Sequence, residues 1–254
     1  MPKIMKKIPR IIATLLLLST TSTLALAACD DPPGKGVIWI GCDKQGVDLR
    51  GLDLRGATLT HTNFSGADLR GTRLSGAEFN FADLSSARLE NARLNKARFV
   101  SANMTNATLN GSFLNGAKLD RALLDKAQLK NARMQGASLY QSSLISANLS
   151  GADLQDAELT QAILTGANLS AANLSGANLE QAILEDAVMK GSNLHKANLK
   201  NANLQFADLS NADLSMAILV NALLSETNLK GARLDKAQWV DRKRCRAGSI
   251  GQCD

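Results

Sequence analysis

The chain has 254 residues, of which 45% are hydrophobic and 20% charged, and its formal net charge is +6. Four of its 29 cations belong to the first ten residues, so the rest of the chain holds 25 basic against 23 acidic residues. This near balance argues against a strongly acidic surface. The four cysteines lack the spacing of a zinc site, which excludes the common cysteine-based metal centres.

The first 28 residues have the composition of an export signal. The basic head consists of Lys3, Lys6, Lys7 and Arg10. An apolar run over residues 11–18 follows, and Ala25-Leu26-Ala27 fits a small-x-small cleavage site. The run is too short, and too soon interrupted by Ser and Thr, for a stable membrane span. We therefore predict that residues 1–28 are a signal peptide and that the mature protein is periplasmic or secreted.

The same segment allows a second interpretation. Leu26-Ala27-Ala28-Cys29 resembles a lipobox, in which Cys29 would be the acylated first residue of an inner-membrane lipoprotein facing the periplasm. Asp30 and Asp31 would then resemble a signal for retention at the inner membrane. A polar Ser-Thr stretch separates this box from the apolar run, and a lipidated Cys29 would leave Cys42 unpaired. Both observations favour plain cleavage, and both interpretations place the protein outside the cytoplasm.

Residues 29–46 precede a long repeat and keep its five-residue spacing only imperfectly. A stack of repeated units exposes unpaired backbone groups and core side chains at each end, so its ends need covering. Trp39 is large enough to cover the first unit, and Leu52, at a place where later units have Ala, fills volume nearby. We predict that residues 29–46 form an N-terminal cap.

From residue 47 to residue 241 the sequence repeats every five residues. Each of 39 consecutive units, from Leu49 to Trp239, has Leu, Phe, Met or Trp at its centre, and 31 units have Ala two places earlier. Gly recurs at the last place of the unit, where a residue that accepts a positive φ suits a turn. No proline interrupts the repeat, which leaves every backbone N–H free to pair.

The period of five excludes the two regular structures. A helix would rotate each central residue roughly 140° from the last and leave no apolar stripe. In a continuous strand, successive central leucines, five residues apart, would lie on opposite faces of a sheet. The chain must therefore turn every five residues, stack its turns, and bury the central residue and the small residue before it in one continuous core.

The unit resembles the signature A-[DN]-L-x-x of the pentapeptide-repeat family, as at Ala67-Asp68-Leu69, Ala152-Asp153-Leu154 and Ala202-Asn203-Leu204. The match covers about four fifths of the chain. The resemblance implies a bacterial, all-β protein, a right-handed quadrilateral β-helix with four units per coil and about ten coils. It fixes the shape and says little about function.

Residues 242–254 leave the repeat after Trp239 and are predicted to form a C-terminal cap. The four cysteines fall in two terminal pairs, Cys29 with Cys42 and Cys245 with Cys253. Because exported proteins keep disulfides, we predict one in each pair, worth up to about 3 kcal/mol by the loop-entropy estimate. Free thiols at these positions are the alternative.

Units twenty residues apart are expected to stack, which sorts the surface into four faces. We predict that the faces centred on Leu49 and Leu54 are net basic and that the face centred on Phe64 is net acidic. On the basic faces, Arg and Asp side chains of neighbouring coils are expected to pair. Five aliphatic residues occupy outward places on the acidic face: Leu123, Ile145, Ile163, Ile183 and Leu223. Exposed aliphatic residues along one side predict an interaction face, although they are also ordinary β-formers.

The sequence predicts no catalytic, cofactor or metal site. His61 and His195 are expected to lie nearly seven coils apart, roughly 30 Å at strand spacing, and cannot share a metal ion. We predict a non-enzymatic, exported interaction or structural scaffold that binds an unknown protein partner or a second copy of itself. Nucleic acid is not expected, and a membrane only if Cys29 is lipidated. The alternatives are the inner-membrane lipoprotein and the DNA-mimicking gyrase binder known in the family that the repeat resembles.

Overall fold

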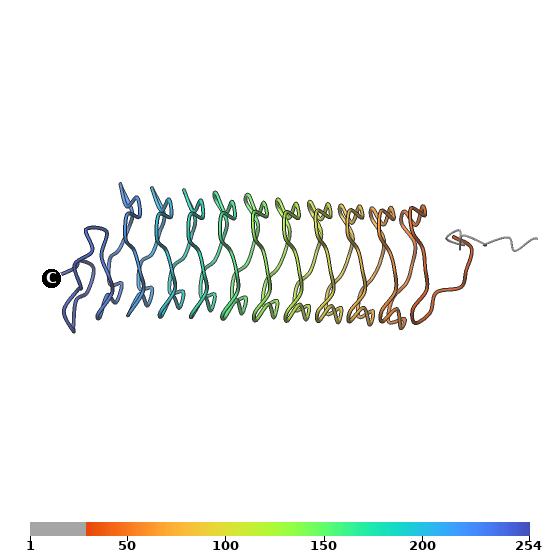
Figure 1. Ribbon diagram of the computed structural model, residues 1–254, viewed down its shortest axis with the longest axis horizontal. Helices are drawn as coiled ribbons and strands as arrows, with labels where there is room; N and C mark the ends of the chain where they lie inside the picture. The colour runs from red at the N-terminus through yellow and green to blue at the C-terminus, as the bar shows by residue number, and fades with distance from the viewer. Residues whose placement is uncertain (1–28) are drawn as a thin grey trace, which may run out of the picture.

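The computed structural model describes residues 29–254, which form one elongated rod (Figure 1). The predicted signal peptide, residues 1–28, lies outside the described residues. The described part of the chain has no helix and no strand longer than a single bridging residue. Isolated parallel bridges recur every five residues instead, from the pair Ile38 and Thr58 to the pair Ile218 and Gln238.

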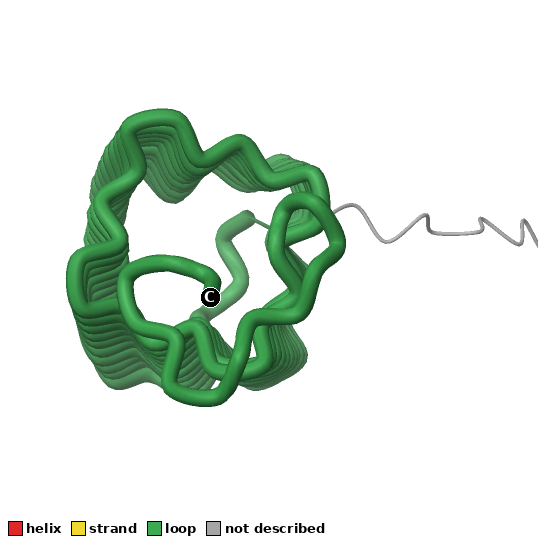
Figure 2. The backbone as a smooth tube through the Cα atoms, turned by 90° about the vertical axis from the view of Figure 1, so that its left-hand side faces the viewer, coloured by secondary structure: helices red, strands yellow, loops and turns green. Residues whose placement is uncertain are grey.

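Each bridge joins residues that are twenty apart in the sequence, as in the series Asp48, Asp68 and Arg88. The Leu69 N–H donates to the Arg88 carbonyl of the next coil at 2.7 Å, while the Asp68 N–H donates to the Val47 carbonyl of the previous coil at 2.9 Å. Four units thus complete one turn of the chain, and Figure 2 shows a closed, roughly four-sided outline down the axis. The stacked β-solenoid predicted from the five-residue period is confirmed.

The corners between units follow one rule. The N–H of each small residue donates back to the carbonyl of the preceding central residue, as Ala57 does to Leu54 at 3.1 Å. The fifth residue of the unit then takes a left-handed conformation, with φ of 69° at Gly51. Non-glycine residues do the same, for example Asn91 at 58° and Lys96 at 59°. Glycine at this place removes the steric cost of a positive φ, but the ladder enforces the conformation on any residue.

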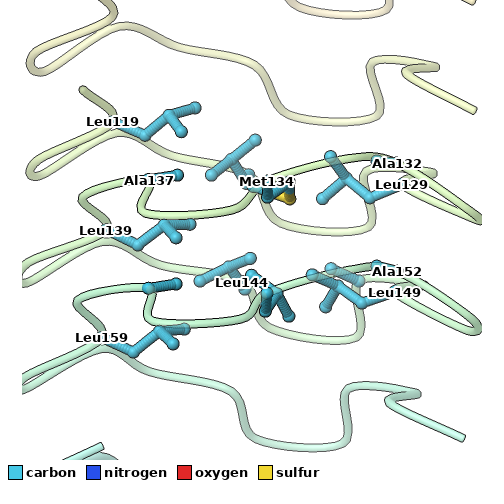
Figure 3. Packing of buried hydrophobic residues seen from close by; sticks show 14 of the residues in the cluster. Leu119, Leu129, Ala132, Met134, Ala137, Leu139, Leu144, Leu149, Ala152 and Leu159 are labelled. Carbon is cyan, nitrogen blue, oxygen red and sulfur yellow. The ribbon is translucent and has the colours of Figure 1, made fainter. Parts of the chain in front are cut away.

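The core is a set of columns that run along the axis. Figure 3 shows Leu119, Leu139 and Leu159 stacked directly over one another, twenty residues apart. Ala137 lies beside this column, and both it and Leu139 are fully buried. The small residue leaves space for the larger one from the neighbouring unit, so both side chains pack in the interior. One hydrophobic cluster therefore extends through the whole rod.

The ladder begins at Ile38, earlier than the predicted boundary at residue 47. Cys42 takes the inward small place, and the unit around it pairs through the bridge between Asp43 and Asn63. The segment predicted as the N-terminal cap therefore already contains two stacked units. Leu52 was expected to fill volume, but it is 37% exposed, because no coil lies beyond it on that side of the rod.

Trp39 was predicted to cover the N-terminal end of the rod. The residues from Cys29 onward instead fold over Trp39 and cover it. Trp39 is buried, and its ring N–H donates to the Asp31 carbonyl at 3.2 Å. The Lys44 ammonium donates to the Cys29 carbonyl at 2.6 Å and lies 4.2 Å from the centre of the Trp39 ring. A disulfide joins Cys29 to Cys42, with a Cα–Cα distance of 5.4 Å.

At the C-terminal end the chain reverses and pairs antiparallel with the last coil. Arg233 bridges to Ile250 and Gln238 bridges to Arg244. The second disulfide joins Cys245 to Cys253, 4.8 Å apart at Cα, and holds this segment together. The pairing covers two sides of the last coil. Leu223 occupies an outward place on another side and is 53% exposed.

Candidate interaction surface

Four of the five aliphatic residues predicted to share a face lie on one outer column of the rod. Consecutive bridges connect the column, whose members from residue 103 are Asn103, Leu123, Ser143, Ile163, Ile183, Asn203 and Leu223. Leu123 is 47% exposed, Ile183 is 38% exposed and Ile163 is half-buried. Ile145 lies two residues after Ser143 in the same unit and is also exposed. We call these five aliphatic residues and the wall that carries them the aliphatic face.

Polar and acidic side chains flank the aliphatic face. Asp125 accepts hydrogen bonds from the Ser143 hydroxyl and, at 3.0 Å, from the Ile145 N–H. Asp125 thereby holds the unit of Ser143 and Ile145, which lies between the units of Leu123 and Ile163. The predicted acidic character of this side comes from Asp83, Asp125, Glu185, Asp186 and Glu226. The face therefore combines spaced aliphatic anchors with a carboxylate rim.

Phe206 is an exposed aromatic residue of this side that the sequence analysis missed. It is 54% exposed and takes the corner place, with φ of 60°, in the unit that contains Asn203. It therefore projects between the levels of Ile183 and Leu223 and extends the apolar part of the face. The signal in the sequence was a large apolar residue at the fifth place of a unit, where Gly or a polar residue is usual.

The other features of the surface do not form a catalytic constellation. His61 stacks on Phe81, with ring centres 4.9 Å apart, and His195 lies more than six coils further along the rod. The Nδ1 atom of His195 is 2.7 Å from the Ser215 hydroxyl, its neighbour on the next coil. Among the described hydrogen bonds no carboxylate holds the other ring nitrogen, so the pair is a contact between coils. Within residues 29–254 no three metal-binding side chains gather.

The basic faces carry carboxylates that pair chiefly within their own unit. Arg50 contacts Asp48 at 2.6 Å and Arg55 contacts Asp53 at 2.5 Å, whereas the contact from Arg50 to Asp68 on the next coil is 3.7 Å. The side-chain hydrogen bond from each arginine lowers the pKa of its aspartate, Asp48 or Asp53, to about 2. The sequence analysis expected pairing between coils, and the structure places the shorter contacts two residues apart along the chain.

Comparison with known proteins identifies the fold family. The family model described as pentapeptide repeats matches in 8 copies, over residues 40–76, 82–121, 122–161, 167–205 and 202–238. The chain belongs to the pentapeptide-repeat family. The predicted resemblance is confirmed by a match to more than half of the chain. No curated protein sequence matches it.

A crystal structure of the pentapeptide-repeat protein HetL, from the cyanobacterium Nostoc, is 36% identical in sequence and superposes with a TM-score of 0.70. The alignment covers 79% of this chain and 92% of HetL, which is described as involved in the regulation of heterocyst differentiation. A thylakoid-lumen pentapeptide-repeat protein from Arabidopsis thaliana is 30% identical over 41% of this chain and 68% of its own, with a TM-score of 0.32.

The plasmid-mediated fluoroquinolone-resistance protein QnrB1 is 21% identical and aligns over 80% of this chain and 91% of its own. Its TM-score is 0.33. Residues 29–254 contain no helix that is long and apolar enough to cross a membrane.

Proposed function

We propose that this pentapeptide-repeat protein is an exported, non-enzymatic scaffold that binds a protein partner, or a second copy of itself, through the aliphatic face. The proposal takes the rod to be a right-handed quadrilateral β-helix of about ten coils. The observation that carries it is the exposure of Leu123, Ile145, Ile183 and Leu223 along one wall. Most other units have a polar residue at the same outward place.

The spacing of these residues suits an interface. Leu123 and Ile183 are three coils apart, about 14 Å at strand spacing, and Leu223 lies two coils further. Interfaces draw most of their binding energy from a few apolar anchors that neighbouring contacts shield from water. A standard interface of about 800 Å² on each partner would cover this length, with the acidic rim at its edge.

Export is supported by the two disulfides that close the ends of the rod. The Cys29 sulfur cannot form a disulfide and carry the thioether of a lipoprotein at the same time. The disulfide between Cys29 and Cys42 therefore supports plain cleavage over the lipoprotein alternative. Mass spectrometry of the mature N-terminus decides between them: an unmodified end near Ala28 supports the exported scaffold, and an acylated Cys29 establishes the lipoprotein.

The DNA-mimicking alternative lacks support from the charge distribution. Mimicry of duplex DNA needs rows of unpaired carboxylates, and several aspartates of this rod contact arginines instead, as Asp53 does Arg55. The similar protein HetL is described as involved in the regulation of heterocyst differentiation, a role that fits a partner-binding scaffold.

The proposal is tested by making the aliphatic face polar. The double substitution Ile163→Asn and Ile183→Asn restores the residue common at this place in other units, so the fold should persist. We expect the partner identified by proximity labelling to be lost, or the mass measured by light scattering to fall to that of one chain.

The matched control changes exposed aliphatic residues on two other faces, Val188→Asn and Ile218→Asn. It should leave both readouts unchanged. If the Ile163→Asn and Ile183→Asn variant keeps the partner and the mass of the parent chain, the aliphatic face is not an interaction site.

A further inference from the structure

Two pairs of stacked like charges lie on neighbouring walls, one opposite the aliphatic face and one adjoining it. Arg73 bridges directly to Arg93 on one wall, and Arg98 bridges directly to Lys118 on the next wall. Lys96 lies at the corner between the two walls, in a left-handed conformation. Arg73, Arg93, Lys96 and Lys118 are exposed and Arg98 is half-buried. We call these five residues the cationic corner.

The cationic corner stacks like charges directly over one another. In several other places a charge contacts an opposite partner: the Asp68 carboxylate is 2.5 Å from Arg70 and 3.7 Å from Arg88, and Glu180 contacts Lys200 at 3.1 Å. On the previous coil Asp53 bridges to Arg73 and Glu78 bridges to Arg98, but neither carboxylate forms an ion pair with its cation. None of the five residues of the cationic corner makes an ion pair within the described part of the chain. Like charges directly opposite on neighbouring strands destabilise a sheet. An anionic ligand would remove that cost.

An aromatic ring continues the first column. Arg93 bridges to Phe113, and Phe113 bridges to Arg133, whose guanidinium lies 4.9 Å from the ring centre. A half-buried ring between two guanidinium groups offers a flat apolar face beside fixed positive charge. This combination suits a ligand that alternates ring faces with anionic groups.

The geometry distinguishes among the anionic polymers. Successive coils are about 4.8 Å apart, close to the length of one sugar in an extended glycan, so the two stacked cations of a column would face two successive sugars. A flat bilayer cannot meet two walls that join at a corner, whereas a flexible chain can follow both. Single-stranded nucleic acid binds on successive aromatic platforms, and the column has only Phe113 between its arginines.

We propose that the cationic corner binds a linear acidic polysaccharide with about one carboxylate per sugar. The arginines would hold carboxylates through charge-assisted, paired hydrogen bonds, and Phe113 would stack against a sugar ring. The choice of a glycan over a nucleic acid rests in part on the proposed export, because acidic polysaccharides belong to the cell exterior. The site is separate from the aliphatic face, so each proposal is tested without the other.

The experiment uses the purified chain and a soluble polygalacturonate as the probe, with neutral dextran as the reference polymer. We expect binding to polygalacturonate that weakens as salt is added, and none to dextran. The double substitution Arg73→Gln and Arg93→Gln should weaken binding about tenfold. Because both residues are exposed, thermal unfolding should stay near that of the parent chain.

The control removes the same charge from exposed residues on a different wall, through Lys190→Gln and Lys230→Gln, and should leave binding within about twofold of the parent chain. No binding to polygalacturonate, or equal losses in the two double variants, would overturn the proposal. So would tighter binding to an oligodeoxythymidine or to phosphatidylglycerol vesicles under the same conditions. Binding is measured with the purified chain in solution, so it does not depend on where the protein lies in the cell. Finding the protein in the cytoplasm would overturn the proposed export but would leave the binding result unchanged.

Discussion

At the scale of single residues, the fifth place of the unit shows which glycines the fold requires. All corners have a positive φ, yet only some glycines face a neighbour on the previous coil. The Asn131 side chain lies where a Cβ at Gly151 would be, and Asn91 does the same at Gly111. Gly136 has a similar φ of 59° and nothing within 4 Å. At Gly111, Gly151 and Gly231 the glycine thus leaves room for an Asn side chain of the previous coil, although Lys126 and Asn221 follow corner Asn residues elsewhere.

The substitution Gly151→Ala should therefore destabilise the rod more than Gly136→Ala. Both variants place an alanine at positive φ, which costs about 1 kcal/mol. Gly151→Ala should cost about 1 kcal/mol more, because the Asn131 side chain must move from its place. Chemical denaturation of the two variants measures the difference.

A double-mutant cycle with Asn131→Gly isolates this contact. In that background Gly151→Ala should cost no more than Gly136→Ala does in the parent chain. Equal costs for the two alanine variants in the parent chain would show that the Asn131 side chain does not constrain Gly151.

At the scale of elements, the two ends are closed in different ways. The N-terminal residues fold over a buried Trp39, whereas the C-terminal segment adds antiparallel pairing at Arg233 and Gln238. Trp239 is only partly buried. Each disulfide closes a short loop within its own end, with sequence separations of 13 and 8 residues. The coils between them contain no crosslink within the described residues, so their stability depends on stacking alone.

Removing a disulfide should therefore loosen one end of the rod. The double substitution Cys245→Ser and Cys253→Ser releases a loop whose closure is worth about 2.5 kcal/mol. Hydrogen exchange followed by mass spectrometry should show faster exchange from about residue 217 onward, with the central coils unchanged.

The substitutions Cys29→Ser and Cys42→Ser form the reciprocal control and should raise exchange at the first coils only. Uniform acceleration along the chain after either change would show that the rod unfolds as one cooperative unit. Local stability would then not be a sum of terms from neighbouring coils.

At the scale of the whole molecule, the period of five determined more than any single residue. It was enough to predict that Leu169 points inward and that Ile163 and Ile183 share an outer column, because both follow from where the chain turns. It did not predict the start of the ladder at Ile38 or the contact between Asp48 and Arg50 within one unit. Those depend on whether an imperfect unit can still stack and on side-chain rotamers, which a repeat does not encode.

The modular period also allows a test in which whole units are removed. Deleting residues 147–156 removes two units and keeps every remaining Leu and Ala in phase, so the core persists. It moves Ile163, Ile183 and Leu223 half a turn around the rod, away from Leu123 and Ile145. Deleting residues 67–86 removes one full coil and leaves all five aliphatic residues, and Phe206, on one face.

Both shortened rods should fold, since solenoid stability is a sum of local and nearest-neighbour terms, and the shorter deletion should be the more stable of the two. Circular dichroism and thermal unfolding check this. We expect partner binding, or self-association, to survive the deletion of twenty residues and to fail after the deletion of ten. Binding by both rods would mean that Leu123 and Ile183 do not act together, and that the aliphatic face is not one interaction site. If binding is lost only in the rod that lacks ten residues, unfolding cannot explain the loss, because that rod is the more stable of the two. The result would identify the alignment of the aliphatic residues along one wall as the feature that the partner recognises.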